Sequence, residues 1–135
     1  MNLKKENGFA MADAVVAVVI LTIFATIIVT VSYNIYVQAN FIKRNDTATN
    51  YIVDLFEYAK TLDIDDVNYA TLAAHFSEDN NLTVTNTDNG TTGKGYTMII
   101  EVQNTNEFIR QINVLVRYKL ARKIKSVNMS TLVNK

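Results

Sequence analysis

The chain has 135 residues, of which 49% are hydrophobic, and its 13 acidic and 13 basic side chains give a formal net charge of zero. This length is about that of one domain. The balanced charge provides no general attraction to nucleic acid or to acidic partners, and the absence of cysteine excludes a disulfide framework and thiolate chemistry.

The charges are unevenly distributed along the chain. From Asp46 to Asp88 the acids dominate and Lys60 is the only base, whereas all charges from Arg110 to Lys135 are basic.

The N-terminal third begins with a short polar segment that ends at Gly8-Phe9 and is followed by an apolar run, Ala10 to Val31. A helix rises ~1.5 Å per residue, so a span of about 23 residues crosses a ~30 Å hydrocarbon core. The run is longer than the apolar core of a secretory signal and lacks a clear small-x-small cleavage site, which disfavours ordinary secretion. Its single charge is Asp13. An ionisable residue within such a span is costly and often functional.

This N-terminal pattern resembles the class III signal of type IV pilins and pseudopilins, in which a basic leader ends in Gly and is followed by Phe, small or apolar residues, an acid and a long apolar helix. The corresponding residues here are Lys4-Lys5-Glu6-Asn7-Gly8, Phe9-Ala10-Met11-Ala12 and Asp13. The chain departs from the family in three ways. It has Asp13 where Glu is usual, no proline within the span, and no cysteine pair near the C-terminus.

The resemblance implies how the N-terminus is processed and used. A prepilin peptidase would cut between Gly8 and Phe9, and Phe9 would become a methylated N-terminus. Asp13 would then pair with the terminal amine of an adjacent subunit, a pairing that physical chemistry favours because an unpaired carboxylate in hydrocarbon costs several kcal/mol. The expected organisation is a leader at 1–8, a transmembrane assembly helix at 9–31, an extracytoplasmic continuation at 32–62 and a small β-rich head at 63–135.

Beyond the apolar run, the apolar residues recur at spacings of three and four, so we expect the helix to continue to about Thr61. Neither Pro nor Gly interrupts the stretch from Phe9 to Thr61. A short helix is expected at about Tyr69 to Phe76, with Asn68 as its N-cap.

Four strands are expected in the remaining chain, at Leu82–Thr85, Tyr96–Val102, Ile112–Tyr118 and Lys123–Leu132. The Gly-rich residues Asp88–Gly95 are expected to form a hairpin turn between the first two strands. The predicted fold class is α+β: a pilin-like arrangement of one long N-terminal α-helix, transmembrane in its first half, packed against a small antiparallel sheet of about four strands.

No other residue set predicts catalysis, a cofactor or a metal site. His75 is the only histidine and there is no cysteine, so the usual zinc ligand sets are missing. The acidic groups Asp63-Asp65-Asp66 and Glu78-Asp79 lack the spacing of an EF-hand and are interpreted as solvated turns. We therefore expect a protein that is not an enzyme.

The basic C-terminal segment provides one route to DNA phosphates. Tyr118 is its only aromatic residue, so stacking platforms for bases are scarce. A solvated strand face or a subunit contact is favoured over nucleic-acid binding.

The sequence and the resemblance together predict a minor pilin, a structural subunit of a type IV pilus-like filament. Its partners would be other pilin subunits, the prepilin peptidase and the assembly platform, and the membrane before assembly. It would lie in the cytoplasmic membrane as a single-pass protein with its N-terminus in the cytoplasm, and later in a cell-surface filament. The alternatives are a pseudopilin of a type II secretion or DNA-uptake apparatus, and an uncleaved bitopic protein that presents a small binding domain.

Overall fold

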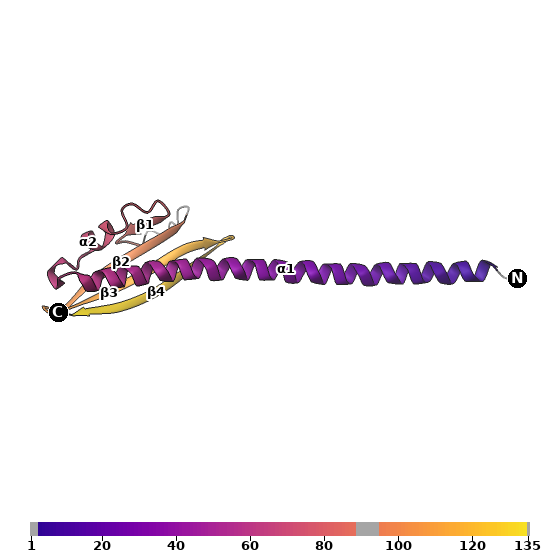
Figure 1. Cartoon of the computed structure of the whole chain (residues 1–135), viewed down its shortest axis with the longest axis horizontal. Helices are drawn as coiled ribbons and strands as arrows, with labels where there is room; N and C mark the ends of the chain where they lie inside the picture. The colour runs from indigo at the N-terminus through magenta and orange to yellow at the C-terminus, as the bar shows by residue number, and fades with distance from the viewer. Residues whose placement is uncertain (1–2, 89–94, 135) are drawn as a thin grey trace. The chain divides into compact units, whose positions relative to one another are not determined.

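The computed structural model describes the backbone of residues 3–88 and 95–134 and the side chains from Met11 onward within those ranges. Two units are distinguished along the chain, Met1–Ala39 and Asn40–Lys135, and the second is called the head below. The elements in chain order are α1 (Leu3–Thr61), the 3-10 turn η1 (Ile64–Asp66), α2 (Tyr69–Ala74), β1 (Leu82–Thr85), β2 (Tyr96–Asn106), β3 (Ile109–Leu120) and β4 (Lys123–Asn134) (Figure 1).

The long helix α1 ends at Thr61, as its apolar periodicity predicts. The four predicted strands are present at the expected places, and three of them are longer than expected. The short helix α2 begins at Tyr69, and the side chain of Asn68 caps it by accepting a hydrogen bond from the Thr71 amide at 3.0 Å. Such a cap satisfies one of the amides that a helix leaves without an intrahelical partner.

The four strands form one sheet in the order β1-β2-β3-β4. Strands β2, β3 and β4 are antiparallel neighbours, but β1 and β2 are parallel, with Leu82 opposite Tyr96. The sheet is therefore mixed, and the prediction of an all-antiparallel sheet was wrong at this edge.

The hairpin turn predicted at Asp88–Gly95 is also wrong, because two strands joined by a hairpin turn would be antiparallel. Ten residues, 86–95, connect β1 to β2. That length suffices for the chain to return beside β1, because a four-residue strand spans only about 13 Å at ~3.3 Å per residue. The glycine-rich residues 89–94 themselves lie outside the described part of the chain.

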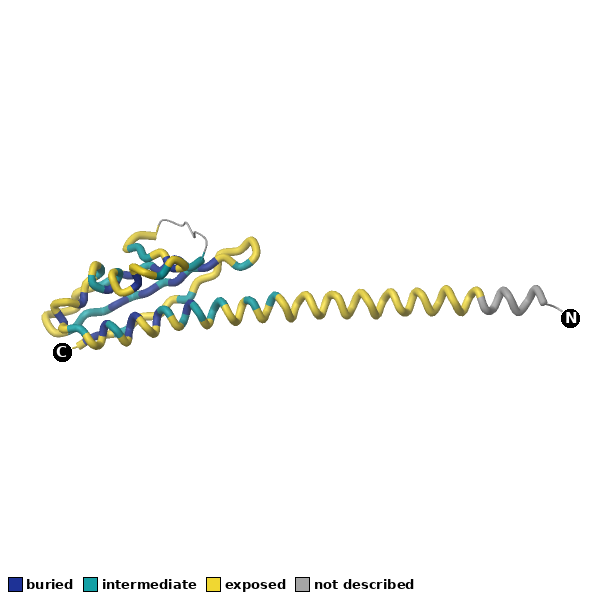
Figure 2. Tube along the Cα trace, turned by 45° about the horizontal axis from the view of Figure 1, so that its top comes forward, coloured by how far each residue is buried: buried dark blue, intermediate teal, exposed yellow. Residues whose placement is uncertain are grey.

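One face of the sheet packs against the part of α1 that belongs to the head. The buried residues of α1 recur at helical spacing, at Ala48, Ile52, Leu55, Phe56 and Ala59. They share a core with alternate residues of the sheet and with residues between α1 and β1: Ile64, Val67, Leu72, Phe76, Leu82, Met98, Ile100, Ile112, Val114, Val116, Tyr118 and Val133. Figure 2 shows these buried positions along the strands and on one side of the helix.

The predicted alternation of β3 is confirmed. Ile112, Val114, Val116 and Tyr118 are all fully buried, and the residues between them are more exposed. Strand β4 is an edge strand with a weaker pattern, because Val133 is its only buried residue among those described. The head is thus a two-layer α+β unit, with α1 on one face of a four-stranded sheet.

Candidate functional site: the exposed apolar segment of α1

The first unit carries an apolar segment, residues 11–31, that the chain itself does not cover. An 18-residue stretch of α1 has a mean hydropathy of 3.0 and none of it is buried. The large apolar side chains of the segment are between 48% exposed (Ile20) and 74% exposed (Met11). Soluble monomers rarely expose a continuous apolar surface of this size. Within the described residues, one helix, near the N-terminus, is long and apolar enough to cross a membrane.

Three threonines lie on one face of this segment at a spacing of four residues. The hydroxyls of Thr22, Thr26 and Thr30 donate to the carbonyl oxygens of Val18, Thr22 and Thr26 at 2.7, 2.8 and 2.8 Å. Each hydroxyl is thereby satisfied within its own helix, so the segment can enter hydrocarbon without unpaired side-chain donors. Small residues four apart also form the faces on which membrane helices approach each other closely. This feature was missed at the sequence level, although the threonine spacing was visible there.

Asp13 is exposed and lies two residues after the start of the described side chains. The backbone at Gly8 and Phe9 belongs to α1, and the side chains of residues 3–10 lie outside the described part. The pairing of Asp13 with the terminal amine of an adjacent subunit stays a prediction.

Two tyrosines follow the apolar segment. Tyr33 and Tyr36 are 66% and 67% exposed on α1. Tyrosine is enriched where a membrane-spanning helix leaves the hydrocarbon, because its ring is apolar and its hydroxyl prefers water. If the helix crosses a membrane, these residues would mark the end of the span at about residues 33–36.

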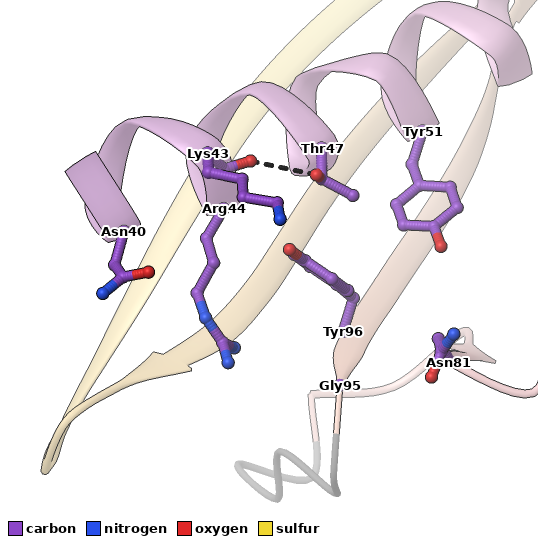
Figure 3. A pocket seen from close by; sticks show the side chains of 8 residues that line it. All are labelled: Asn40, Lys43, Arg44, Thr47, Tyr51, Asn81, Gly95 and Tyr96. Atoms are coloured by element: carbon purple, nitrogen blue, oxygen red, sulfur yellow. Dashed lines mark hydrogen bonds between the residues drawn. The ribbon is translucent and has the colours of Figure 1, made fainter.

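The head has an open pocket of about 500 Å³ between α1 and the start of β2 (Figure 3). Its lining is polar and aromatic: Asn40, Lys43, Arg44, Thr47, Tyr51, Asn81, Gly95 and Tyr96. Tyr51 donates to a carboxylate oxygen of Asp79 at 2.7 Å. Burial, reinforced by the hydrogen bond to Asp79 and by the charge of that carboxylate, raises the pKa of Tyr51 to about 12. The phenol is thus held neutral and serves as a structural donor.

Tyr118, on the inner strand β3, also links α1 to the rest of the head through its hydroxyl group. Its ring is fully buried, and its hydroxyl donates to the Asn45 side chain on α1 at 3.3 Å. Burial and the neighbouring Tyr96 raise the pKa of this phenol, while Arg44 acts in the opposite direction. Both tyrosines therefore fix α1 to the rest of the head.

Packing and hydrogen bonds account for His75 and Asp79, two of the residues considered for metal binding. His75 stacks on Tyr58 with ring centroids 4.1 Å apart, and its Nε2 lies 3.3 Å from a carboxylate oxygen of Asp54. Asp63, Asp65 and Asp66 are exposed around η1. Asp79 is more than a solvated turn residue, because it accepts hydrogen bonds from Tyr51 and from the Asn81 amide. Among the described residues, no three His, Cys, Asp or Glu side chains come together to hold a metal ion.

Comparisons of the chain with protein-family models, with curated proteins and with solved structures gave no match.

Proposed function

We propose that this protein is a structural subunit of a type IV pilus-like filament, and a minor rather than a major one. The observation that carries the proposal is the exposed apolar segment of α1 with the single acid Asp13 near its start, directly after Gly8-Phe9. A small head built on the later part of the same helix completes the arrangement that such a subunit needs.

In the proposed mechanism, the apolar segment is inserted in the membrane before assembly. In the filament, its contacts with lipid are replaced by contacts with the helices of neighbouring subunits. Subunits related by a repeated rotation and rise form an open helical filament, because each contact joins two different surfaces. Between helices in such an apolar environment, close packing at small residues replaces the hydrophobic effect as the cohesive interaction. The threonine face of α1 provides small residues for such packing, and its hydroxyls are already satisfied within the helix.

Asp13 has a specific role in this proposal. Cleavage after Gly8 would create an ammonium group at Phe9, and Asp13 of one subunit would neutralise that group on the next. Either charge alone is unfavourable in a helix bundle of low dielectric constant. Pairing the carboxylate of one subunit with the ammonium group of the next removes both unpaired charges when the filament forms. Asp is one methylene shorter than Glu, and this limits how far the carboxylate reaches.

Filament incorporation of Asp13 variants tests the proposal. Asp13→Ala should leave membrane insertion intact and reduce the amount of the protein in sheared filaments at least tenfold, because a broken ion pair in a dry interface costs about 3–5 kcal/mol. Asp13→Glu is the matched control, since it keeps the charge and should retain incorporation. Equal incorporation of wild type and Asp13→Ala would contradict the assigned role.

The alternatives predict different results. An uncleaved bitopic protein would keep its N-terminal residues and would never enter sheared filaments. A pseudopilin would be cleaved like a pilin, but would be found with secretion or DNA-uptake components rather than with a surface pilus.

A further inference from the structure

The end of the head where Asn40 lies carries a cluster of basic side chains, called the basic end here. Two cations come from α1 and four from the β3–β4 turn and its flanks: Lys43, Arg44, Lys119, Arg122, Lys123 and Lys125. The turn lies beside this part of the helix, since Lys125 Nζ is 5.8 Å from the centroid of the Phe41 ring and Tyr118 reaches Asn45. Figure 1 shows the turn at the same end of the head.

The cations of the basic end are not neutralised within the described residues. The ion pairs between described residues are His75–Asp54 and Arg117–Asp88, and neither involves these six side chains. Asp46 is the nearest acid along α1. The exposed acids Asp63, Asp65 and Asp66 follow the other end of the helix. The head is therefore electrically asymmetric, although the whole chain has no net charge.

Apolar side chains are exposed among these cations. Ile124, which lies between Lys123 and Lys125, is 53% exposed, and on α1 Phe41 is 38% and Ile42 is 57% exposed. A surface that mixes Lys and Arg with exposed apolar groups is typical of segments that lie in the interface of an anionic membrane. A purely acidic protein surface would leave these apolar groups without a favourable contact.

The order of residues along the chain also favours a membrane. Lys43 and Arg44 follow Tyr33 and Tyr36 by only seven to eleven residues. Basic residues that closely follow a membrane-spanning segment are attracted to anionic lipid, and each contributes about 1 kcal/mol near the surface.

We propose that the basic end of the head binds the anionic phospholipid headgroups of the membrane that the apolar segment of this chain enters. The inference rests on the membrane-inserted state in the proposed function and adds a specific ligand to it. Contact with anionic lipid stabilises the subunit in the membrane, so anionic lipid opposes its extraction into a filament.

Because the chain has no cysteine, single labelling sites can be introduced cleanly. The full-length chain is reconstituted in vesicles with an environment-sensitive fluorophore at Ser126→Cys, near the basic turn, or at Thr105→Cys, near the opposite end of the sheet. Both positions are exposed. The vesicles contain phosphatidylcholine alone or phosphatidylcholine mixed with phosphatidylglycerol, together with a lipid that carries a quencher on its headgroup.

Quenching at Ser126→Cys should increase with the fraction of phosphatidylglycerol and decrease when salt is added, whereas Thr105→Cys should show neither effect. Each cation near an anionic surface contributes about a fivefold factor to the ratio of bound to free heads. The triple variant Arg122→Gln, Lys123→Gln, Lys125→Gln should therefore lower this ratio about 100-fold. The charge-preserving variant Arg122→Lys, Lys123→Arg, Lys125→Arg is the matched control and should behave as wild type.

Quenching at Ser126→Cys that is independent of phosphatidylglycerol would overturn the inference while the chain remains inserted. Quenching that follows the protein-to-lipid ratio instead would assign the basic end to the acidic surface of a second copy. Extraction of the chain from the vesicles by alkaline carbonate would overturn both this inference and the proposed function, so the two failures are distinguishable.

Discussion

The later part of α1 should behave as the core of the head, and Ile52→Ala tests this directly. Ile52 is fully buried against the sheet, and the substitution removes three carbon atoms from a packed site. At about 0.8 kcal/mol per buried methylene the transfer term alone is ~2.4 kcal/mol, and the remaining cavity adds to it. The adjacent Val53 is 39% exposed, so Val53→Ala should change stability by less than about 0.5 kcal/mol.

The assay is urea or thermal unfolding of the full-length chain in detergent micelles. It is followed by the near-ultraviolet circular dichroism of the packed tyrosines, because the chain has no tryptophan. For a domain of this size, Ile52→Ala should lower Tm by about 10 °C or more. Equal destabilisation by Ile52→Ala and Val53→Ala, or none by either, would refute the assignment of this helix face to the core.

Two further predictions concern the head. Gly95 has a φ of +121°, and a Cβ there would collide with the carbonyl oxygen of Asn81. Gly95→Ala should therefore cost more than about 2 kcal/mol in the same unfolding assay, and a loss below about 0.5 kcal/mol would contradict this close approach. The raised pKa of Tyr51 means that the unfolded chain loses this phenolic proton first, so the stability contribution is complete below pH 10 and is lost as pH rises from about 10 through about 12. Tyr51→Phe should flatten that alkaline decline, and an unchanged pH profile would count against the buried, hydrogen-bonded phenol.

Much of the fold was predictable because its signals are local. The end of α1 at Thr61, the Asn68 cap and the bounds of β1 each depend on residues that are close in sequence. The alternation of β3 was equally clear, because both of its neighbours are strands and one of its faces is fully buried.

The parallel pairing of β1 with β2 could not be predicted in the same way. The relative direction of two strands depends on the path of the chain between them. A Gly-rich segment of ten residues can form a hairpin turn, which gives antiparallel strands, or run back beside the first strand, which gives parallel ones. The role of Asp79 was also hidden, since Tyr51 lies 28 residues away in sequence. Strand β4 gave an irregular pattern because only one side of it has a neighbouring strand.

The candidate site depends on a linear motif. Gly8, Phe9 and Asp13 were singled out by the resemblance of that motif to the pilin signal, and their proposed interaction, which joins two subunits, stays a prediction. The basic end of the head required the fold, because β4 brings Lys125 next to Phe41 across more than half of the chain.

The most direct test of the central claim is mass spectrometry of the N-terminus, after expression of the chain with and without a prepilin peptidase. The proposed function predicts that, with the peptidase, the chain begins at Phe9 and carries a methyl group there, and that Gly8→Leu prevents the cleavage. A wild-type chain that still carries Lys4-Lys5 in the presence of an active peptidase would contradict the assignment as a filament subunit.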